Sequence, residues 1–176
     1  LPDELPYEEA ASVPLVFQTA WRALMTRAGL RAGETVLVTG ASGGVSTAAI
    51  QIARLAGARV LAVTAGEANA ERVRELGADM VIDRVEEDFS RAAWQATDRR
   101  GVDVVLDSVG EAMWEGCVRA LARDGRLVTY GATTGAEGKL DIRRLFWKQA
   151  RVMGSTMATR GEFERVMGLV FEGRLQ

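Results

Sequence analysis

Short apolar runs alternate along the chain with longer stretches in which apolar and polar residues mix. The apolar runs have the length of strands and occupy residues 35–40, 58–65, 79–84, 102–110, 125–135 and 150–157. The mixed stretches show helical spacing over residues 45–56, 69–79, 86–101, 111–125, 140–149 and 161–173. Because short continuous apolar runs are typical of strands buried on both faces, the pattern predicts six strands that alternate with helices.

This alternation predicts an α/β fold with a doubly wound, mostly parallel sheet of six strands. Helices between successive strands cover both faces of such a sheet. Right-handed crossovers leave few strand orders, and we expect the Rossmann order 3-2-1-4-5-6. A further helical pattern covers residues 7–29, and we expect Pro14 to interrupt it because proline lacks the amide N–H that a helix interior needs.

Composition narrows the classes of partner. The chain has 176 residues, 48% of them hydrophobic, and a net charge of −2, so we expect neither nucleic acid nor a membrane as its partner. Its one cysteine, Cys117, fits a reducing, cytoplasmic environment, and we expect it to be a buried structural thiol. The absence of histidine makes a zinc site within this segment implausible.

The segment VLVTGASGGVS, residues 36–46, predicts a nucleotide site. It reads as a strand that turns onto a helix, and phosphates bind at such a helix start. Gly43 and Gly44 allow the backbone to approach a pyrophosphate, because neither has a Cβ. The free N–H groups of Gly44, Val45 and Ser46 would point at it.

Three other nucleotide motifs can be compared with this segment. A P-loop is excluded, because the one Gly-Lys pair, Gly138-Lys139, is followed by Leu140. A short-chain dehydrogenase needs Tyr-x-x-x-Lys, and Tyr130 is followed by Thr134 at the lysine position. A methyltransferase remains open, although no acidic residue ends the second strand.

Six segments carry a resemblance to a known family and follow one another in its order and spacing. They are LPYEEAASVPLVFQTAW, GETVLVTGASGGVSTAAIQIARLAGARV, RVRELGADMVID, GVDVVLDSVG, GRLVTYGATTG and RRLFWKQARVMGSTM. Together they resemble the cofactor-binding domain of the medium-chain dehydrogenase/reductase superfamily, in its branch of quinone oxidoreductases and zinc-type alcohol dehydrogenase-like proteins. The resemblance covers nearly the whole chain.

The resemblance implies a division of the chain, since full-length members also carry a substrate domain. Residues 1–30 would be linker helices from that missing domain, and residues 31–160 the dinucleotide-binding domain. Residues 161–176 would begin a helix that returns to the missing domain, so we expect both ends of the chain to be cut.

The resemblance also implies a set of cofactor-binding positions and no catalytic or metal-binding residue. Thr19 would face the nicotinamide, Val109 and Gly110 would lie near the ribose, and the backbone of Ser155 and Met157 would bond the carboxamide. The full set is Thr19, Ser42, Gly43, Gly44, Val45, Ser46, Thr64, Ala65, Asn69, Arg84, Val109, Gly110, Gly131, Ala132, Thr133, Ser155 and Met157. For Thr19, the alternative is a hydroxyl bonded to its own helix.

Ser46 departs from the glycine that the family usually has at the start of this helix. That glycine allows close packing of helix on strand. We expect the Ser46 hydroxyl to bond back into its own helix; the alternative is a donor to the pyrophosphate.

The end of the second strand bears on the choice between NAD(H) and NADP(H). An acid there would accept bonds from the ribose 2′-hydroxyl and repel a 2′-phosphate, but Thr64 and Ala65 are neutral. NADP-preferring relatives usually have a lysine where this chain has Asn69, and often a tyrosine where it has Arg84. We therefore expect NADP(H) in preference to NAD(H), with Arg84 as the clamp for the phosphate.

Two observations oppose that expectation. Arg84 could instead be a solvated arginine paired with a carboxylate of the next turn, namely Glu86, Glu87 or Asp88. Glu67, close to the second strand, also weighs against a phosphate.

These observations predict the nucleotide-binding domain of an NAD(P)(H)-dependent oxidoreductase. By the resemblance, the full-length enzyme would transfer hydride to or from a carbonyl, a quinone or an activated alkene, and this segment alone would be inactive. One alternative is a dinucleotide-binding or sensing module without turnover. Another is a structural piece, and we expect a homodimer through residues 152–157, whose strand lies at the sheet edge.

Overall fold

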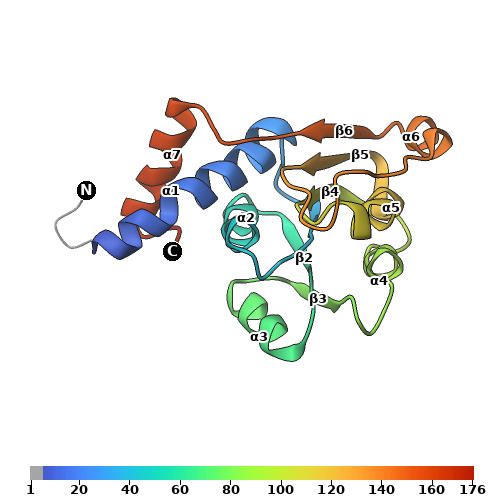
Figure 1. Cartoon of the computed structure of the whole chain (residues 1–176), viewed down its shortest axis with the longest axis horizontal. Helices are drawn as coiled ribbons and strands as arrows, with labels where there is room; N and C mark the ends of the chain where they lie inside the picture. The colour runs from blue at the N-terminus through green and yellow to red at the C-terminus, as the bar shows by residue number, and fades with distance from the viewer. Residues whose placement is uncertain (1–5) are drawn as a thin grey trace.

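The computed structural model describes residues 6–176 and shows a parallel sheet of six strands (Figure 1). The strands are β1 (Thr35–Val38), β2 (Arg59–Thr64), β3 (Met80–Asp83), β4 (Val102–Asp107), β5 (Leu121–Thr129) and β6 (Arg151–Gly154). Their order is β3-β2-β1-β4-β5-β6, and every neighbouring pair is parallel. The predicted fold class and strand order are confirmed.

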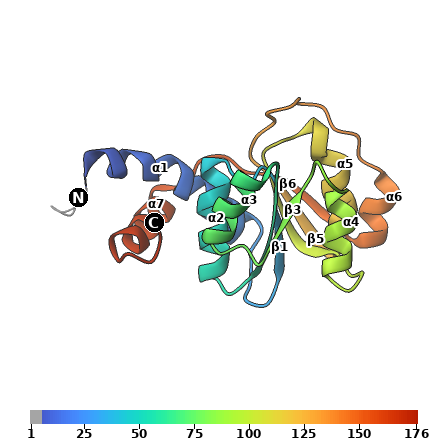
Figure 2. The same ribbon diagram turned by 90° about the horizontal axis from the view of Figure 1, so that it is seen from below.

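Helices cover both faces of the sheet, as Figure 2 shows. The helices are α1 (Tyr7–Trp21), α2 (Gly44–Leu55), α3 (Glu67–Glu75), α4 (Phe89–Ala96), α5 (Glu111–Ala120), α6 (Ile142–Lys148) and α7 (Arg160–Phe171). Helices α2 and α3 lie on one face, and α4 and α5 lie on the other. None of the helices in the described part of the chain is long and apolar enough to cross a membrane.

The central strand supplies both layers of the core because its successive side chains point to opposite faces. Val36 and Val38 belong to the cluster beneath α1 and α2, whereas Leu37 belongs to the cluster beneath α4 and α5. All three side chains are fully buried. Because both faces of β1 are buried, its residues do not alternate between apolar and polar.

Helix α1 runs past Pro14 without a break, so the expected interruption is wrong. Val13, directly before the proline, and Phe17, one turn after Val13, are buried against the core, and their packing outweighs the lost backbone hydrogen bond. The irregular part comes later, where Arg22–Arg27 form a wider π-helical turn.

A second correction concerns residues 121–125, which were expected to end the helix before them. Helix α5 ends at Ala120, and β5 begins at once because Leu121 pairs with Val102. The register then shifts before Val104 pairs with Arg126, and Asp124 has a positive φ of 60° at this irregularity.

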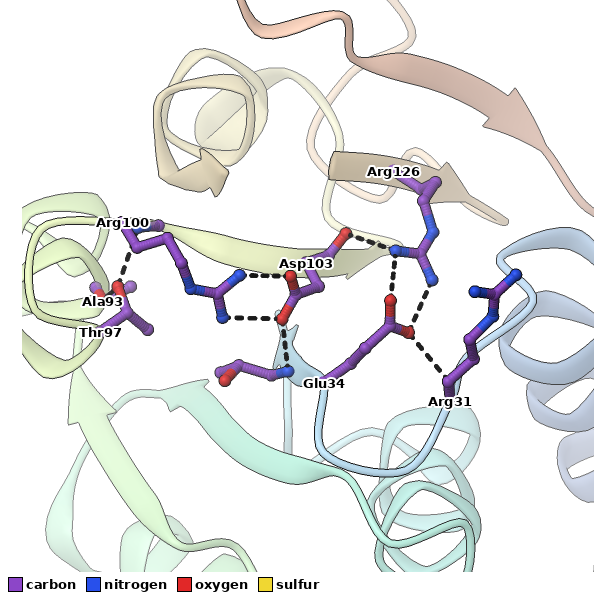
Figure 3. A network of polar contacts seen from close by, with 9 residues as sticks. Arg31, Glu34, Ala93, Thr97, Arg100, Asp103 and Arg126 are labelled. Atoms are coloured by element: carbon purple, nitrogen blue, oxygen red, sulfur yellow. Dashed lines mark hydrogen bonds and ion pairs between the residues drawn. The ribbon is translucent and has the colours of Figure 1, made fainter. Parts of the chain in front are cut away.

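Ionic side chains connect the amino ends of three strands (Figure 3). The Arg126 guanidinium on β5 donates to both oxygens of Glu34, at 2.9 and 2.8 Å, and to the carbonyl of Ala28 at 2.9 Å. Asp103 on β4 accepts from the Thr35 amide at 2.7 Å and from Arg100. We call Glu34, Arg100, Asp103 and Arg126 the amino-edge network.

Helices α1 and α7 pack against each other beside the sheet (Figure 1). Glu162 begins α7 in a capping box with Thr159 and also forms an ion pair with Arg22 at 2.7 Å. Assignment of residues 1–30 and 161–176 to segments that lead to a substrate domain stays a prediction, and residues 1–5 lie outside the described part.

Candidate functional site

The loop between β1 and α2 lies at the carboxyl end of the central strand. Gly43 is the N-cap of α2, and no side chain caps the helix start, so the first amides of α2 are free to bind a ligand. Gly40 has a positive φ of 55°, and a Cβ there would lie 3.2 Å from Val109 Cγ2. The loop is therefore the uncapped, positive end of a helix dipole.

A side chain would be unfavourable at Gly43 and at Gly44 for two different reasons. A Cβ at Gly43 would lie 3.3 Å from the Gly40 carbonyl oxygen, so it would crowd the turn itself. A Cβ at Gly44 would lie 3.1 Å from Val16 Cγ1 on α1. Gly44 thus permits the close packing of α2 on α1, a contact that the motif alone does not reveal.

A cleft of about 770 Å³ opens beside this loop and brings together six of the predicted residues, a volume typical of small-molecule sites. They are Ser42, Thr64, Ala65, Asn69, Arg84 and Val109. The cleft is also lined by residues that the sequence analysis did not select, namely Gly40, Val63, Val85, Glu86, Glu87, Asp88, Phe89, Ala112, Met113, Arg119 and Thr134.

The end of β2 presents neutral groups to the cleft. The Asn69 amide donates to the Ala65 carbonyl at 2.9 Å, and Thr64 is buried. Glu67 forms an ion pair with Arg74 at 2.6 Å. Asp83, at the end of β3, accepts from the amides of Val85 and Gly66 at 2.9 Å each, and these bonds lower the pKa of its carboxyl.

Arg84 lines the cleft and is exposed. Within the described part of the chain, no carboxylate lies within 4 Å of its guanidinium, so the expected alternative of a pair with Glu86, Glu87 or Asp88 is not seen. Asp88 instead caps α4 and contacts Arg119 at 3.2 Å.

Asp107 is a functional candidate that the sequence analysis missed. It is fully buried at the end of β4 and accepts from the Thr39 hydroxyl at 2.5 Å. It also accepts from the amides of Val109 and Gly110, at 3.2 and 3.0 Å. One carboxylate thus holds both loops at the mouth of the cleft. The sequence does contain a signal for this role, because Asp107 is an acid at the end of an apolar strand and directly precedes Ser-x-Gly.

Burial raises the pKa of the Cys117 thiol well above its ordinary value, and neighbouring Asp107 adds to the rise. The side chain is fully buried. The prediction of a structural thiol is confirmed by this position. No three His, Cys, Asp or Glu side chains gather into a metal site among residues 6–176.

Comparison with known proteins decides the family. Residues 44–172 match the family model described as zinc-binding dehydrogenase. The chain belongs to the zinc-binding dehydrogenases. This places it in the medium-chain dehydrogenase/reductase superfamily, as the resemblance predicted.

Individual relatives of this chain include reductases and a dehydrogenase. It is 37% identical to an acryloyl-coenzyme A reductase of Metallosphaera sedula, covering 100% of this chain and 51% of that protein. The crystal structure of an NAD-dependent alcohol dehydrogenase has a TM-score of 0.93 and 40% identity, over 99% of this chain and 51% of the other. A 2-octenoyl-CoA carboxylase reductase, in complex with NADP and 2-octenoyl-CoA, has a TM-score of 0.92 and 30% identity, over 99% and 43%. The chain thus spans about half the length of these relatives.

The residues that the family resemblance assigns to the nicotinamide lie outside the cleft described above. The Thr19 hydroxyl donates to the Leu15 carbonyl at 2.7 Å within its own helix, which is the alternative that the sequence left open. The Ser155 amide donates to Thr129 at 2.9 Å, so this N–H is already used. The Ser155 hydroxyl is buried and has no hydrogen-bond partner in the described part.

Most of the other positions that the resemblance assigns to the nicotinamide side belong to the loop after β5. Both the amide and the hydroxyl of Thr133 donate to the Ser108 carbonyl, at 3.1 Å each. A Cβ on Gly131 would lie 3.1 Å from that carbonyl oxygen. Ala132 lies against Gly110, where an added Cβ would be 2.9 Å from the Ala132 Cα, and Met157 has a positive φ of 49°.

Ser46 does not bond back into its own helix, so that expectation is wrong. Its hydroxyl lies 3.1 Å from the Thr39 carbonyl oxygen and 3.0 Å from the Tyr130 hydroxyl, and the residue is 1% exposed. The hydroxyl therefore crosses from α2 to the ends of β1 and β5, because the helix packs directly on those strands.

Proposed function

We propose that the chain binds NADP(H) and, in the whole protein, presents the nicotinamide for reduction of an activated alkene. The single observation that carries the proposal is the cleft at the uncapped start of α2, with the cation Arg84 at its β2–β3 end. Free amides of a helix start bind phosphate oxygens, and a guanidinium adds charge-assisted hydrogen bonds.

The residues present fit the cofactor at two points. The amides of Gly44, Val45 and Ser46 would hold the pyrophosphate, and Ser42 lines the cleft beside them. At the other end, the buried Ser155 hydroxyl has no hydrogen-bond partner among residues 6–176, which is rare in proteins. The family resemblance assigns the backbone of this residue to the carboxamide, and the hydroxyl is the group of Ser155 that is left to bond it.

Preference for NADP(H) rests on the charges around Arg84. No acid ends β2, and Glu67 is paired with Arg74. Asp83 accepts from two backbone amides but also attracts the neighbouring Arg84, so it competes with a phosphate for this cation. Arg84 is the cation that we propose for the 2′-phosphate. Glu86 and Glu87 line the same cleft and oppose it, so NAD(H) is the alternative cofactor.

The reaction class rests on the names of the relatives. When bound, the reduced nicotinamide supplies the hydride, and the chain orients it. The acryloyl-coenzyme A reductase and the octenoyl-CoA reductase support an alkene conjugated to a thioester carbonyl. The alcohol dehydrogenase supports the second candidate, a carbonyl or alcohol substrate. We assign no catalytic residue in this segment and expect no turnover without the substrate domain.

The cofactor proposal is tested by calorimetric titration of the chain with NADPH and NADH. Arg84→Ala should weaken NADPH binding about tenfold and change NADH binding less than twofold, because only NADPH carries the 2′-phosphate. Arg123→Ala removes an exposed arginine that does not line the cleft and should change neither. If the ratio of the two dissociation constants stays unchanged, Arg84 does not contact the 2′-phosphate and only faces solvent.

We also propose a cytoplasmic dimer that forms through β6. This strand ends the sheet, and Val152 is 37% exposed on it. A charge at such an edge opposes pairing with a second chain, so Val152→Lys should shift the sedimenting species toward monomer. Leu55→Lys, on α2 and equally 37% exposed, should leave the oligomer unchanged. A Val152→Lys chain that stays dimeric would exclude this edge.

A further inference from the structure

Three hydrogen-bonding groups connect the ends of two strands through the first turn of α2. Ser46 Oγ lies 3.1 Å from the Thr39 carbonyl oxygen and 3.0 Å from the Tyr130 hydroxyl. Thr39 follows β1 and Tyr130 follows β5. The connection thus reaches from the end of β5 through α2 to the end of β1.

The direction of these bonds follows from the donors available. A backbone carbonyl only accepts, so Ser46 must use its single hydroxyl hydrogen toward Thr39. Tyr130 must then be the donor in its contact with Ser46. The Ser46 hydroxyl thus donates once and accepts once, which fixes the direction of both bonds.

The two ends of the pair lie in the two halves of the proposed cofactor site. Ser46 is in the first turn of α2, whose amides would hold the pyrophosphate. Tyr130 directly precedes Gly131, Ala132 and Thr133, the positions that the family resemblance assigns to the nicotinamide side. The Tyr130 amide is fixed as well, since it donates to the Asp107 carbonyl at 3.0 Å.

We infer that Tyr130 and Ser46 are a pair of positioning residues that set the nicotinamide loop against the pyrophosphate-binding turn of α2. Glycine, the family's usual residue at position 46, has no side chain to make this connection. Serine needs more room than glycine where α2 packs on the strands, and its buried hydroxyl has the Tyr130 phenol as a hydrogen-bond partner. This inference rests on the proposed function, because it concerns how the same site holds its cofactor.

Two ligands separate this role from a general effect on folding. NADPH spans both halves of the site, whereas adenosine 2′,5′-bisphosphate lacks both the pyrophosphate and the nicotinamide. Tyr130→Phe removes the hydroxyl alone and should weaken NADPH binding about fivefold, the factor expected for one net hydrogen bond. Binding of the bisphosphate should change less than twofold. Tyr7→Phe is the matched control, because Tyr7 is the chain's other tyrosine and is 83% exposed.

A double-mutant cycle tests whether the two residues act together. Ser46→Ala should reproduce the selective loss of NADPH affinity, and the double variant with Tyr130→Phe should bind no more weakly than either single variant. In the whole protein, Tyr130→Phe should lower kcat and leave the KM for the alkene substrate unchanged.

Three outcomes would overturn the inference. Unchanged NADPH binding by Tyr130→Phe would show that the pair positions nothing, and an equal loss for both ligands would show an effect on the fold instead. Additive losses in the double variant would show that the residues act separately. If the unmodified chain bound neither ligand, the proposed function would fail first, and this inference would fail with it.

Discussion

At the amino ends of the strands, charged side chains neutralise one another, whereas at the carboxyl ends hydroxyls and one buried carboxylate bond to backbone. The amino-edge network joins Glu34 with Arg126, and Asp103 with Arg100 (Figure 3). At the other edge, Asp107 accepts from Thr39 and from two amides, and Ser46 bonds the Thr39 carbonyl.

This difference shows how one sheet separates stability from binding. The four charges of the amino-edge network are paired with one another, so they offer little to attract a ligand. At the carboxyl edge the first amides of α2 keep their hydrogens free, and Arg84 has no carboxylate partner among the described residues. The positive ends that remain unpaired are the ones that an anionic cofactor would meet.

Removing the centre of the amino-edge network should give the largest change in stability. Arg126 is 8% exposed and bonds Glu34 and the Ala28 carbonyl, so Arg126→Ala leaves a partly buried carboxylate without its partner. We expect the free energy of unfolding to fall by about 3 kcal/mol, as measured by urea denaturation. Dinucleotide affinity of the folded fraction should stay within twofold.

Arg160→Ala is the matched control for that measurement. Its ion pair with Glu164 has a similar N···O distance of 2.8 Å, but both side chains are exposed, so its loss should hardly change stability. Equal destabilisation by the two variants would contradict the distinction between the network and surface ion pairs.

The sequence predicts features that depend on neighbouring residues better than hydrogen bonds between residues far apart in the chain. The strand order follows from local patterns and the crossover rule, because alternation and the Gly-Gly turn are properties of short segments. Several of the six cleft residues, among them Asn69, Arg84 and Val109, were predicted through the family resemblance. Asp107 was missed because its partner Thr39 lies 68 residues away, and Ser46 lies 84 residues from Tyr130. No spacing rule connects such pairs; only the strand order brings them together.

The same limit explains the two errors in the helices. Pro14 was expected to break α1 from its backbone chemistry alone, yet the packing of Val13 and Phe17 keeps the helix continuous. Residues 121–125 show a helical pattern, but the pairing of Leu121 with Val102 places them in β5. In both places long-range contacts outweighed local preference.

At the carboxyl edge, we expect the largest loss of cofactor binding from a substitution at Gly44. A Cβ there would lie 3.1 Å from Val16 Cγ1, and the branched carbons of valine extend further, so Gly44→Val should push the start of α2 away from α1. We expect NADPH binding to weaken about tenfold, as measured by calorimetry. Gly161→Val, in α7 with nothing within 4 Å of an added Cβ, is the control and should bind normally. Equal affinity in Gly44→Val and the unmodified chain would exclude the α2 start from the site.

The smallest expected effect is a difference in pH dependence between the two edges. Burial alone would raise the pKa of Glu34, but hydrogen bonds from Arg126 and the Arg31 amide lower it below its ordinary value of 4.5. Since the folded state binds this proton less readily, the stabilisation is present above pH 4.5 and is lost as pH falls below that value. Asp103 follows the same direction, because its bonds from Arg100 and the Thr35 amide outweigh its burial.

Glu34→Gln should therefore flatten the decline in unfolding free energy between about pH 5 and pH 3. Tyr130→Phe should leave that slope unchanged, because burial raises the pKa of the phenol and keeps it protonated throughout this range. Urea denaturation at several pH values measures both slopes. If Glu34→Gln keeps the full decline, the acid sensitivity lies elsewhere. Glu162 is then the source to expect, since its bonds from Thr26, Thr159 and Arg22 outweigh burial and lower its pKa to about 2.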